Sequence, residues 1–273
     1  MEPSAVTTSK NPGLQFYHQV LGLDDLHYGL WRGEALTFEN LKAAQRRYTA
    51  ELLDWIDDGV ETVLDVGCGY GGIASVMKER GLKVTGLTPD ENQKSAFVDA
   101  TGFPCYIAKY QDFEPDHTFD LVLMSQSCHH LPLTGLFQVT KQVAPGGFLL
   151  AADYFLLARD GTRTTRLGHL VDRFGEAAAA AEFDLLREAD ITDDVLPTLD
   201  FAKELVDQRL IPALQIARQT ALRKYPLTTR SLLWLFRRKI GQFDERRRYV
   251  DRDDFVKYKR YMKYLFRVPG ETG

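Results

Sequence analysis

The chain lacks long apolar runs, paired cysteines and an excess of positive charge. No stretch of its 273 residues approaches the roughly 18 uncharged apolar residues that cross a bilayer, so we expect no transmembrane helix. The first five residues (Met1 to Ala5) hold no basic or apolar region, so we expect no secretory signal there. The net charge of −4 argues against general nucleic-acid binding. We therefore expect an ordinary globular protein.

Cysteine is scarce and scattered. Cys68, Cys105 and Cys128 form no CxxC pair and show no His/Cys spacing typical of a metal site. The sequence therefore predicts reduced thiols, no bound metal and a cytoplasmic location.

Short apolar runs alternate with helical patterns from about residue 60 onward. The apolar runs are expected strands, at 62–66, 83–87, 105–108, 119–125, 147–154, 183–191 and 261–268. Amphipathic stretches lie between them, at 72–80, 89–100, 133–143 and 164–181. Such alternation builds right-handed βαβ units, and strands without polar alternation are covered on both faces. The sequence predicts an α/β fold, a Rossmann-like and mostly parallel seven-stranded sheet with helices on both faces.

The remaining segments flank or interrupt this core. Residues 1–12 are expected to be a flexible leader, and 13–58, with an amphipathic helix over 40–56, to form N-terminal lid helices. The core is assigned to 59–196 and 259–270, and 197–258 to a helical acceptor lid inserted between the last two strands.

A glycine-rich turn follows the first strand. Asp65 ends that strand, and the turn runs Gly67-Cys68-Gly69-Tyr70-Gly71-Gly72 into a helix. Glycines let a ligand approach main-chain atoms, and the helix N-terminus offers free N–H groups. A dinucleotide enzyme would carry an acidic residue at the end of the second strand. Here that strand ends in Thr88, with the pattern of a helix N-cap, so Asp90 or Gln93 could reach a ribose instead. NAD is disfavoured.

Five motifs in this order resemble class I S-adenosylmethionine-dependent methyltransferases, in the subgroup of tocopherol, sterol, sugar O-methyltransferases and cyclopropane-fatty-acid synthases. They are Val63-Leu64-Asp65-Val66-Gly67-Cys68-Gly69, Val84-Thr85-Gly86-Leu87-Thr88 followed by Gln93, Phe119-Asp120-Leu121-Val122, Ser127-Cys128-His129-His130-Leu131-Pro132 and Ala144-Pro145-Gly146-Gly147. The resemblance implies S-adenosylmethionine as the cofactor.

The resemblance also implies which residues hold that cofactor. Asp65, Gly67 and Gly69, with the adjacent Cys68, would hold the methionine part. Thr88 and Gln93 would sit near the ribose, and Ser125 and Gln126 would face the sulfonium. Gln111 or Asp112 would meet the adenine, although Lys109 stands where many relatives have an aspartate.

Two histidines and an aspartate are the candidate catalytic residues. His129 and His130 follow the fourth strand, at the edge of the sheet where ligands bind, and a neutral imidazole suits a general base. By analogy with the sugar O-methyltransferases, either histidine would be the base, and Asp153 would orient it or bind an acceptor hydroxyl. Each could instead be structural. Cyclopropane-forming relatives carry a glutamate at the position of His129, so ring closure is disfavoured.

The lid residues carry less information. Tyr28 and Trp31 would cover the sulfonium, although Trp31 could equally pack between helices, and Trp234 would face the acceptor. From Arg218 to Arg248 ten Lys/Arg stand against two acidic residues, a net charge of +8. This segment could be a solvated basic face, a site for an anionic acceptor, or a contact with an anionic membrane surface.

Together these features predict a methyltransferase of a small, largely hydrophobic natural-product acceptor, with O-methylation and a histidine base as the first choice. Two alternatives remain: C-methylation of an isoprenoid or lipid-like acceptor, and a methyltransferase-like cyclase that keeps the cofactor without transferring methyl. A small-molecule partner, no nucleic acid, and a monomer or homodimer are expected.

Overall fold

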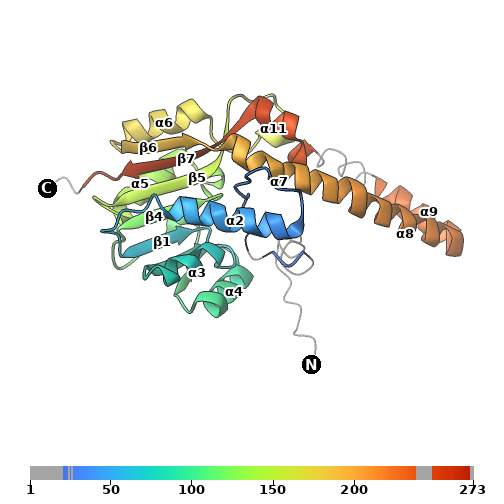
Figure 1. Ribbon diagram of the computed structural model, residues 1–273, viewed down its shortest axis with the longest axis horizontal. Coiled ribbons are helices and arrows are strands. Elements are labelled where there is room, and N and C mark those ends of the chain that lie inside the picture. The colour runs from blue at the N-terminus through green and yellow to red at the C-terminus, as the bar shows by residue number, and fades with distance from the viewer. Residues whose placement is uncertain (1–20, 24, 26, 238–247, 271–273) are drawn as a thin grey trace.

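A seven-stranded sheet forms the centre of the molecule (Figure 1). The computed structural model describes residues 21–23, 25, 27–237 and 248–270. The strand order is β3-β2-β1-β4-β5-β7-β6. The first five strands are parallel, and β7 is antiparallel to both of its neighbours. The strands are β1 Thr62–Val66, β2 Lys83–Thr88, β3 Cys105–Ile107, β4 Leu121–Ser125, β5 Phe148–Leu156, β6 Asp184–Asp190 and β7 Lys259–Arg267. The predicted Rossmann-like, mostly parallel sheet is confirmed.

Helices cover both faces of this sheet. They are α2 Phe38–Leu53, α3 Gly72–Glu79, α4 Glu91–Thr101, α5 Leu133–Val143, α6 Val171–Ala180, α7 Thr192–Leu205, α8 Ile211–Lys224, α9 Pro226–Leu235 and α11 Arg252–Tyr258. Single turns are η2 Tyr110–Asp112, η3 Cys128–His130, η4 Arg163–Thr165 and η6 Arg248–Val250, and η5 Val206–Leu210 is a π-helical turn.

Side chains of one strand alternate between two apolar cores. In β4, Leu121 and Leu123 join the core under α2, α3 and α7, whereas Val122 and Met124 join the core under α5 and α6. All four are fully buried, which explains why the strand sequence is apolar throughout. The carboxyl ends of β1, β2, β4 and β5 therefore meet at one edge of a rigid sheet.

The helix predicted over 164–181 is shorter than expected. It begins only at Val171, because the preceding residues are held in a loop. Gly168 adopts φ +105°, and the Arg159 guanidinium donates to the carbonyls of Thr165 and Gly168. The carbonyl of His169 accepts from the Leu156 amide at the end of β5.

The predicted boundary at residue 197 falls inside a helix. α7 starts at Thr192, directly after β6, and continues through η5 into α8. The π turn lies just before Pro212, whose ring would clash with an ordinary helical carbonyl one turn earlier. The predicted boundary thus divides a helix whose residues Val195, Leu196 and Leu199 belong to the main core. The predicted leader, 1–12, lies outside the described residues, and within the described part of 13–58 the helix is α2.

Helices α8 and α9 form a hairpin that extends away from the body (Figure 1). Neither helix contains a buried residue. In the part of the chain that the structure describes, no helix is long and apolar enough to cross a membrane.

Candidate active site

A cavity of about 430 Å³ opens at the carboxyl ends of β1, β2 and β4. It brings together most of the residues predicted to bind the cofactor. The predicted residues that line it are Asp65, Gly67, Cys68, Gly69, Thr88, Gln93, Ser125, Gln126 and His130. Asp90, the alternative candidate for the ribose, also lines it, together with Asp25, His27, Tyr70 and Ser127, which the sequence analysis did not assign to the cofactor.

Gly67 shows why the turn requires glycine. Its φ is +77°, and a Cβ built there would lie 2.6 Å from the Cβ of Ser127. Ser127 Oγ is buried and has no hydrogen-bond partner among the described residues. The backbone of Gly67 thus packs directly against Ser127, whose buried hydroxyl is unsatisfied among the described residues. This is the geometry expected where a ligand completes the site.

Asp65 points into the same cavity. It is only 3% exposed, and its carboxylate has no hydrogen bond or ion pair with the described residues. Burial raises the pKa of Asp65 to about 7. A cationic ligand group at this position would favour the ionised carboxylate, so the site fits the ammonium of an amino-acid moiety.

Thr88 does not cap the following helix, contrary to the expectation from its sequence pattern. Asp90 is the N-cap of α4, and its carboxylate accepts from the amides of Asn92 and Gln93. The Thr88 hydroxyl instead donates to Gln93 Oε1 at 2.6 Å. The helix begins two residues later than predicted, after a bend at Pro89. Thr88 and Gln93 are thus held together on the cavity wall.

Gln111 and Asp112 lie on η2 and are exposed. Neither lines the cavity. Their contact with the adenine therefore stays a prediction.

His129 and Asp153 form a buried pair at the ends of β4 and β5. The Asp153 carboxylate is fully buried and accepts from His129 Nδ1 at 2.8 Å. It also accepts from the amides of His129 and Tyr154 and from the Cys128 thiol. Because this carboxylate fixes the proton on Nδ1, it leaves Nε2 of His129 as the basic nitrogen. The pair has the geometry of an oriented general base.

His130 and His169 support this pair without joining it. The rings of His129 and His130 lie 3.8 Å apart, and partial withdrawal from water, then the neighbouring His129, lowers the pKa of His130. No sequence motif singled out His169. Its Nε2 lies 2.9 Å from the carbonyl oxygen of Cys128, and burial lowers its pKa. Of the two predicted bases, His129 is the one that an aspartate orients.

A network of hydroxyl groups backs the cavity. Tyr48 OH lies 3.0 Å from Ser125 Oγ and 2.9 Å from Tyr261 OH, and Gln126 Nε2 donates to Tyr261 OH at 3.0 Å. Gln126 adopts a φ of +56°, which directs its side chain to this network. Tyr28 packs on the ring of Tyr261 with centroids 5.5 Å apart. Ser125 and Gln126 are therefore fixed where the sulfonium end of a cofactor would lie.

The two tryptophans predicted for the lid have other positions. Trp31 is buried and donates through Nε1 to Thr198 Oγ1 at 2.9 Å, so it packs α7 against the N-terminal segment. Trp234 is 66% exposed on α9 and does not line the cavity.

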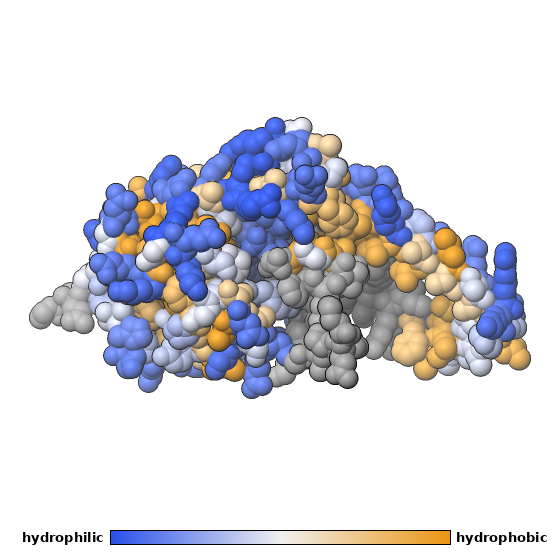
Figure 2. Space-filling model, turned by 60° about the horizontal axis from the view of Figure 1, so that its bottom comes forward, coloured by the Kyte–Doolittle hydropathy of each residue, from blue (hydrophilic) through white to orange (hydrophobic). Residues whose placement is uncertain are grey.

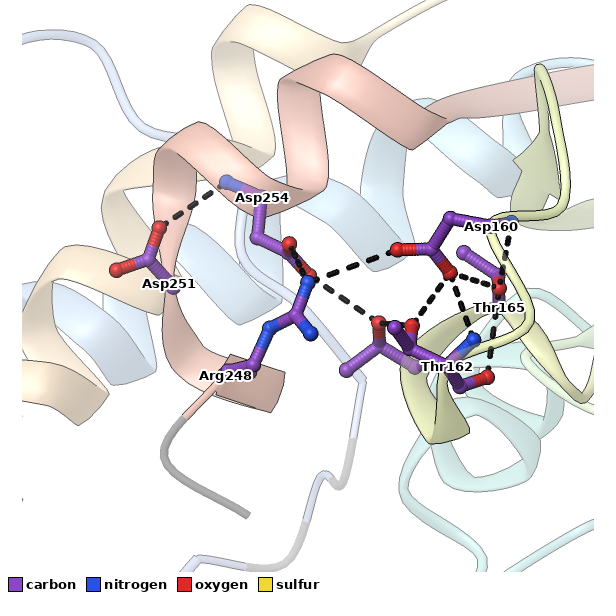
Figure 3. A network of polar contacts seen from close by, with 7 residues as sticks. Asp160, Thr162, Thr165, Arg248, Asp251 and Asp254 are labelled. Carbon is purple, nitrogen blue, oxygen red and sulfur yellow. Dashed lines mark hydrogen bonds and ion pairs between the residues drawn. The ribbon is translucent and has the colours of Figure 1, made fainter. Parts of the chain in front are cut away.

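An ionic network lies in the loop that follows β5 (Figure 3). Arg248 pairs with Asp160 at 3.7 Å and also with Asp254. Asp160 accepts hydrogen bonds from Thr162 and Thr165 in its own loop. The loop that follows β5 is thereby tied to η6 and to the first turn of α11.

Comparison with known proteins shows which family the chain resembles in sequence. A family model described as a methyltransferase domain matches residues 38–188, more than half of the chain. The chain is 35% identical over 111 residues to 2-methyl-6-phytyl-1,4-hydroquinone methyltransferase of Synechocystis sp., covering 37% of this chain and 34% of that protein. It is 32% identical over 152 residues to 27-O-demethylrifamycin SV methyltransferase of Amycolatopsis mediterranei, covering 49% and 53%. The match thus spans about a third to a half of these relatives.

Solved structures extend the likeness in fold to nearly the whole chain. The [4+2]-cyclase SpnF superposes with a TM-score of 0.67 at 20% identity, covering 95% of this chain and 96% of the other. Geranyl diphosphate C-methyltransferase of Streptomyces coelicolor A3(2) superposes with a TM-score of 0.66 at 14% identity. The superposition covers 96% of this chain and 100% of the other. At these identities the likeness concerns the fold alone.

Proposed function

The chain belongs to the methyltransferase-domain family, and on that premise we propose that it transfers a methyl group from S-adenosylmethionine to a hydroxyl of a small, largely hydrophobic acceptor. The observation that supports the proposal is the pair of His129 and Asp153, in which the carboxylate accepts from His129 Nδ1 at 2.8 Å. The ring of His129 lies 3.8 Å from that of His130, which lines the cavity. The predicted family, cofactor and class of enzyme are confirmed by the family match.

The residues of the cavity fit the cofactor. Asp65 would meet the methionine ammonium, and the backbone of Gly67 and Gly69, which lines the same cavity, would hold the amino-acid part. Thr88 and Gln93 would face the ribose. When bound, S-adenosylmethionine supplies a methyl group on a positively charged sulfur. Ser125 and Gln126, fixed by Tyr48 and Tyr261, would border that sulfur and exclude water.

His129 then has one task, which is to take the proton of the acceptor hydroxyl. Asp153 holds the ring and stabilises the imidazolium that forms. Positioned general bases of this kind contribute roughly 10²- to 10⁴-fold in rate. Beside the pair lie aromatic rings of Tyr28, Tyr154, Phe255 and Tyr261, which favours an apolar acceptor.

Methyl-labelled S-adenosylmethionine and a panel of hydroxylated polyketides, phenols and isoprenoids test the proposal. We expect label on oxygen in at least one product, and its loss with His129→Asn at unchanged cofactor affinity. Label on carbon would favour the alternative C-methylation. Conversion of an acceptor to an isomer, with the cofactor recovered intact, would favour the cyclase and contradict methyl transfer.

We also propose that the hairpin of α8 and α9 contacts an anionic lipid surface. Residues 211–237 contain five Lys/Arg and no Asp/Glu, whereas the rest of the chain has 29 against 38. The hairpin exposes apolar side chains along both helices, and Figure 2 shows them gathered at that end of the molecule. The most exposed are Leu214, Ile216, Leu227, Trp234 and Leu235. Basic residues beside exposed aromatic and aliphatic ones are typical of interfacial helices.

Flotation with phosphatidylglycerol and phosphatidylcholine vesicles tests this contact. We expect binding to the anionic vesicles alone, lost with the double change Arg223→Glu and Lys224→Glu. The matched control, Lys141→Glu with Arg173→Glu, reverses two charges on α5 and α6 and should leave binding intact. Absence of vesicle binding, or a stable dimer that the hairpin variant dissociates, would contradict the proposal.

A further inference from the structure

Lys259 places a buried ammonium beside the candidate active site. It is the first residue of β7 and is only 8% exposed. Its Nζ lies 4.6 Å from the ring centroid of Tyr154 and 5.6 Å from that of Phe255. Among the described residues it makes no side-chain hydrogen bond or ion pair. Among the described residues, the ammonium therefore contacts the faces of two aromatic rings and no hydrogen-bond acceptor.

Three guanidinium groups near this end of the sheet pair with carboxylates. Arg248 pairs with Asp254 (Figure 3), and Arg252 and Arg260 pair with Asp200 and Asp190. These guanidinium groups are at least a third exposed, so water also solvates them. Lys259 differs on both counts, because it is buried and lacks a carboxylate partner.

The ring of Tyr154 lies between Lys259 and the pair of His129 and Asp153. Tyr154 directly follows Asp153, and its ring centroid lies 4.7 Å from that of His129. Lys259 pairs with Leu156 in the β5–β7 register, two residues beyond Tyr154. The ammonium thus lies at the carboxyl end of β5, on the aromatic wall that would border an acceptor.

Leaving a buried cation without a hydrogen-bond acceptor is costly, and cation–π contacts offset only about 0.5–2 kcal/mol. In agreement, burial lowers the pKa of Lys259, although Asp254 and Asp153 act in the opposite direction. A bound anion would supply the missing acceptor and convert this cost into affinity.

We propose that Lys259, with Tyr154 and Phe255, forms a binding subsite for a negatively charged oxygen of the acceptor, either a carboxylate or an ionised acidic hydroxyl. This inference rests on the proposed function, because it specifies the class of acceptor for the same site. It assigns Lys259 as a residue that selects the acceptor and not as the base.

Calorimetric titration of the S-adenosylhomocysteine-loaded protein tests the subsite without turnover. Benzoate and benzamide form one pair of probes, and 4-nitrophenolate and 4-nitroaniline form the other. We expect at least one anion to bind about tenfold or more tighter than its neutral partner, since charge-assisted hydrogen bonds are worth about 1.5–3 kcal/mol. The pair that shows the preference identifies the source of the charge. No preference in either pair would overturn the inference.

Substitutions assign the preference to one side chain. Lys259→Met should abolish it, and Lys259→Arg should keep it. The matched control is Lys263→Met, because Lys263 is 4% exposed on the same strand and its Nζ lies 4.4 Å from the ring centroid of Trp55. That variant should behave as the unaltered protein. Retained S-adenosylhomocysteine affinity shows that each variant is folded, and a preference that survives Lys259→Met refutes the assignment.

Failure of the subsite and failure of the proposed function are separable. Anion preference without methyl transfer in the labelling assay would leave the subsite standing and remove the function. Transfer to an acceptor without any anion preference would do the reverse.

Discussion

The cofactor side and the acceptor side of the site differ in whether their buried polar groups have hydrogen-bond partners. On the cofactor side, the Asp65 carboxylate and Ser127 Oγ face the cavity or the glycine turn without a partner among the described residues. On the acceptor side, Asp153 accepts from four donors, and the hydroxyls of Tyr48 and Tyr261 bond to each other. In the cofactor half these two polar groups are left for the ligand, whereas in the acceptor half the polar groups other than the Lys259 ammonium bond to one another.

This difference implies separate functions for the two halves. Changes in the cofactor half should alter affinity for the cofactor, since we expect its unpartnered polar atoms to bind that ligand. Changes in the acceptor half should alter the rate of transfer or the stability, because its polar atoms hold one another. Each of the following predictions tests that separation.

The largest effect is expected from His129→Asn. Removing the basic nitrogen should lower kcat by about 10²-fold or more, with S-adenosylhomocysteine affinity unchanged within twofold. Asp153→Asn should act in the same direction, because it no longer fixes the proton on Nδ1. Single-turnover transfer and calorimetry measure the two quantities. His130→Ala is the control and should keep kcat within about tenfold; if it alone abolishes transfer, the assignment of the base is wrong.

Gly67→Ala should mainly weaken cofactor binding. A Cβ would collide with Ser127, so the glycine turn or Ser127 must shift at the cavity wall, and we expect affinity to fall by more than about tenfold. The control is Gly81→Ala, whose φ of +84° is equally left-handed but whose Cβ would meet nothing within 4 Å. Both should lose roughly 1–2 kcal/mol of stability from backbone strain. Equal losses of affinity in the two variants would contradict the account.

Asp65 should make cofactor affinity depend on pH. With a pKa of about 7 in the free protein, the carboxylate is mostly neutral at pH 6 and ionised at pH 8. Because the ionised form attracts the ammonium, S-adenosylhomocysteine should bind about tenfold tighter at pH 8.

The same raised pKa predicts a stability effect of opposite sign. The fold favours neutral Asp65, so its contribution to stability is present at low pH and is lost as pH rises through about 7. Asp65→Asn should therefore remove the pH dependence of binding and stabilise the free protein above pH 7. Thermal melts at pH 6 and 8 measure this, and a variant less stable at pH 8 would refute it.

The smallest effect is expected from Tyr261→Phe. Loss of the hydroxyl leaves Tyr48 and Gln126 without one buried partner each, which should cost about 1–3 kcal/mol in urea unfolding. Cofactor affinity should change little. An affinity loss larger than the stability loss would place Tyr261 in the cofactor half.

The cofactor half was largely predictable because it is local in sequence. Asp65, Gly67 and Gly69 lie in one strand–turn–helix unit, and Thr88 and Gln93 lie at the next such turn. The error concerned the cap of the second helix, because Asp90 and not Thr88 caps α4. Gln111 and Asp112 lie on η2 and do not line the cavity, and their contact with the adenine stays a prediction.

The acceptor half was predictable only where two parallel strands end together, as for His129 and Asp153. Tyr48, Tyr261 and Lys259 come from a helix near the start and a strand near the end of the chain. Their meeting depends on the register of β5 against β7, which no local pattern encodes. The contribution of Trp234 was overestimated because an apolar, basic helix can project away as well as cover a site.

The most direct test compares one variant from each side of the site, Gly67→Ala and His129→Asn. Two quantities are measured in both variants: the affinity for S-adenosylhomocysteine, and single-turnover methyl transfer at saturating cofactor. The account predicts that Gly67→Ala loses affinity but regains transfer within about tenfold once saturated. It predicts that His129→Asn keeps affinity and loses transfer by about 10²-fold or more. Parallel loss of both quantities in both variants, or full transfer by His129→Asn, would contradict it.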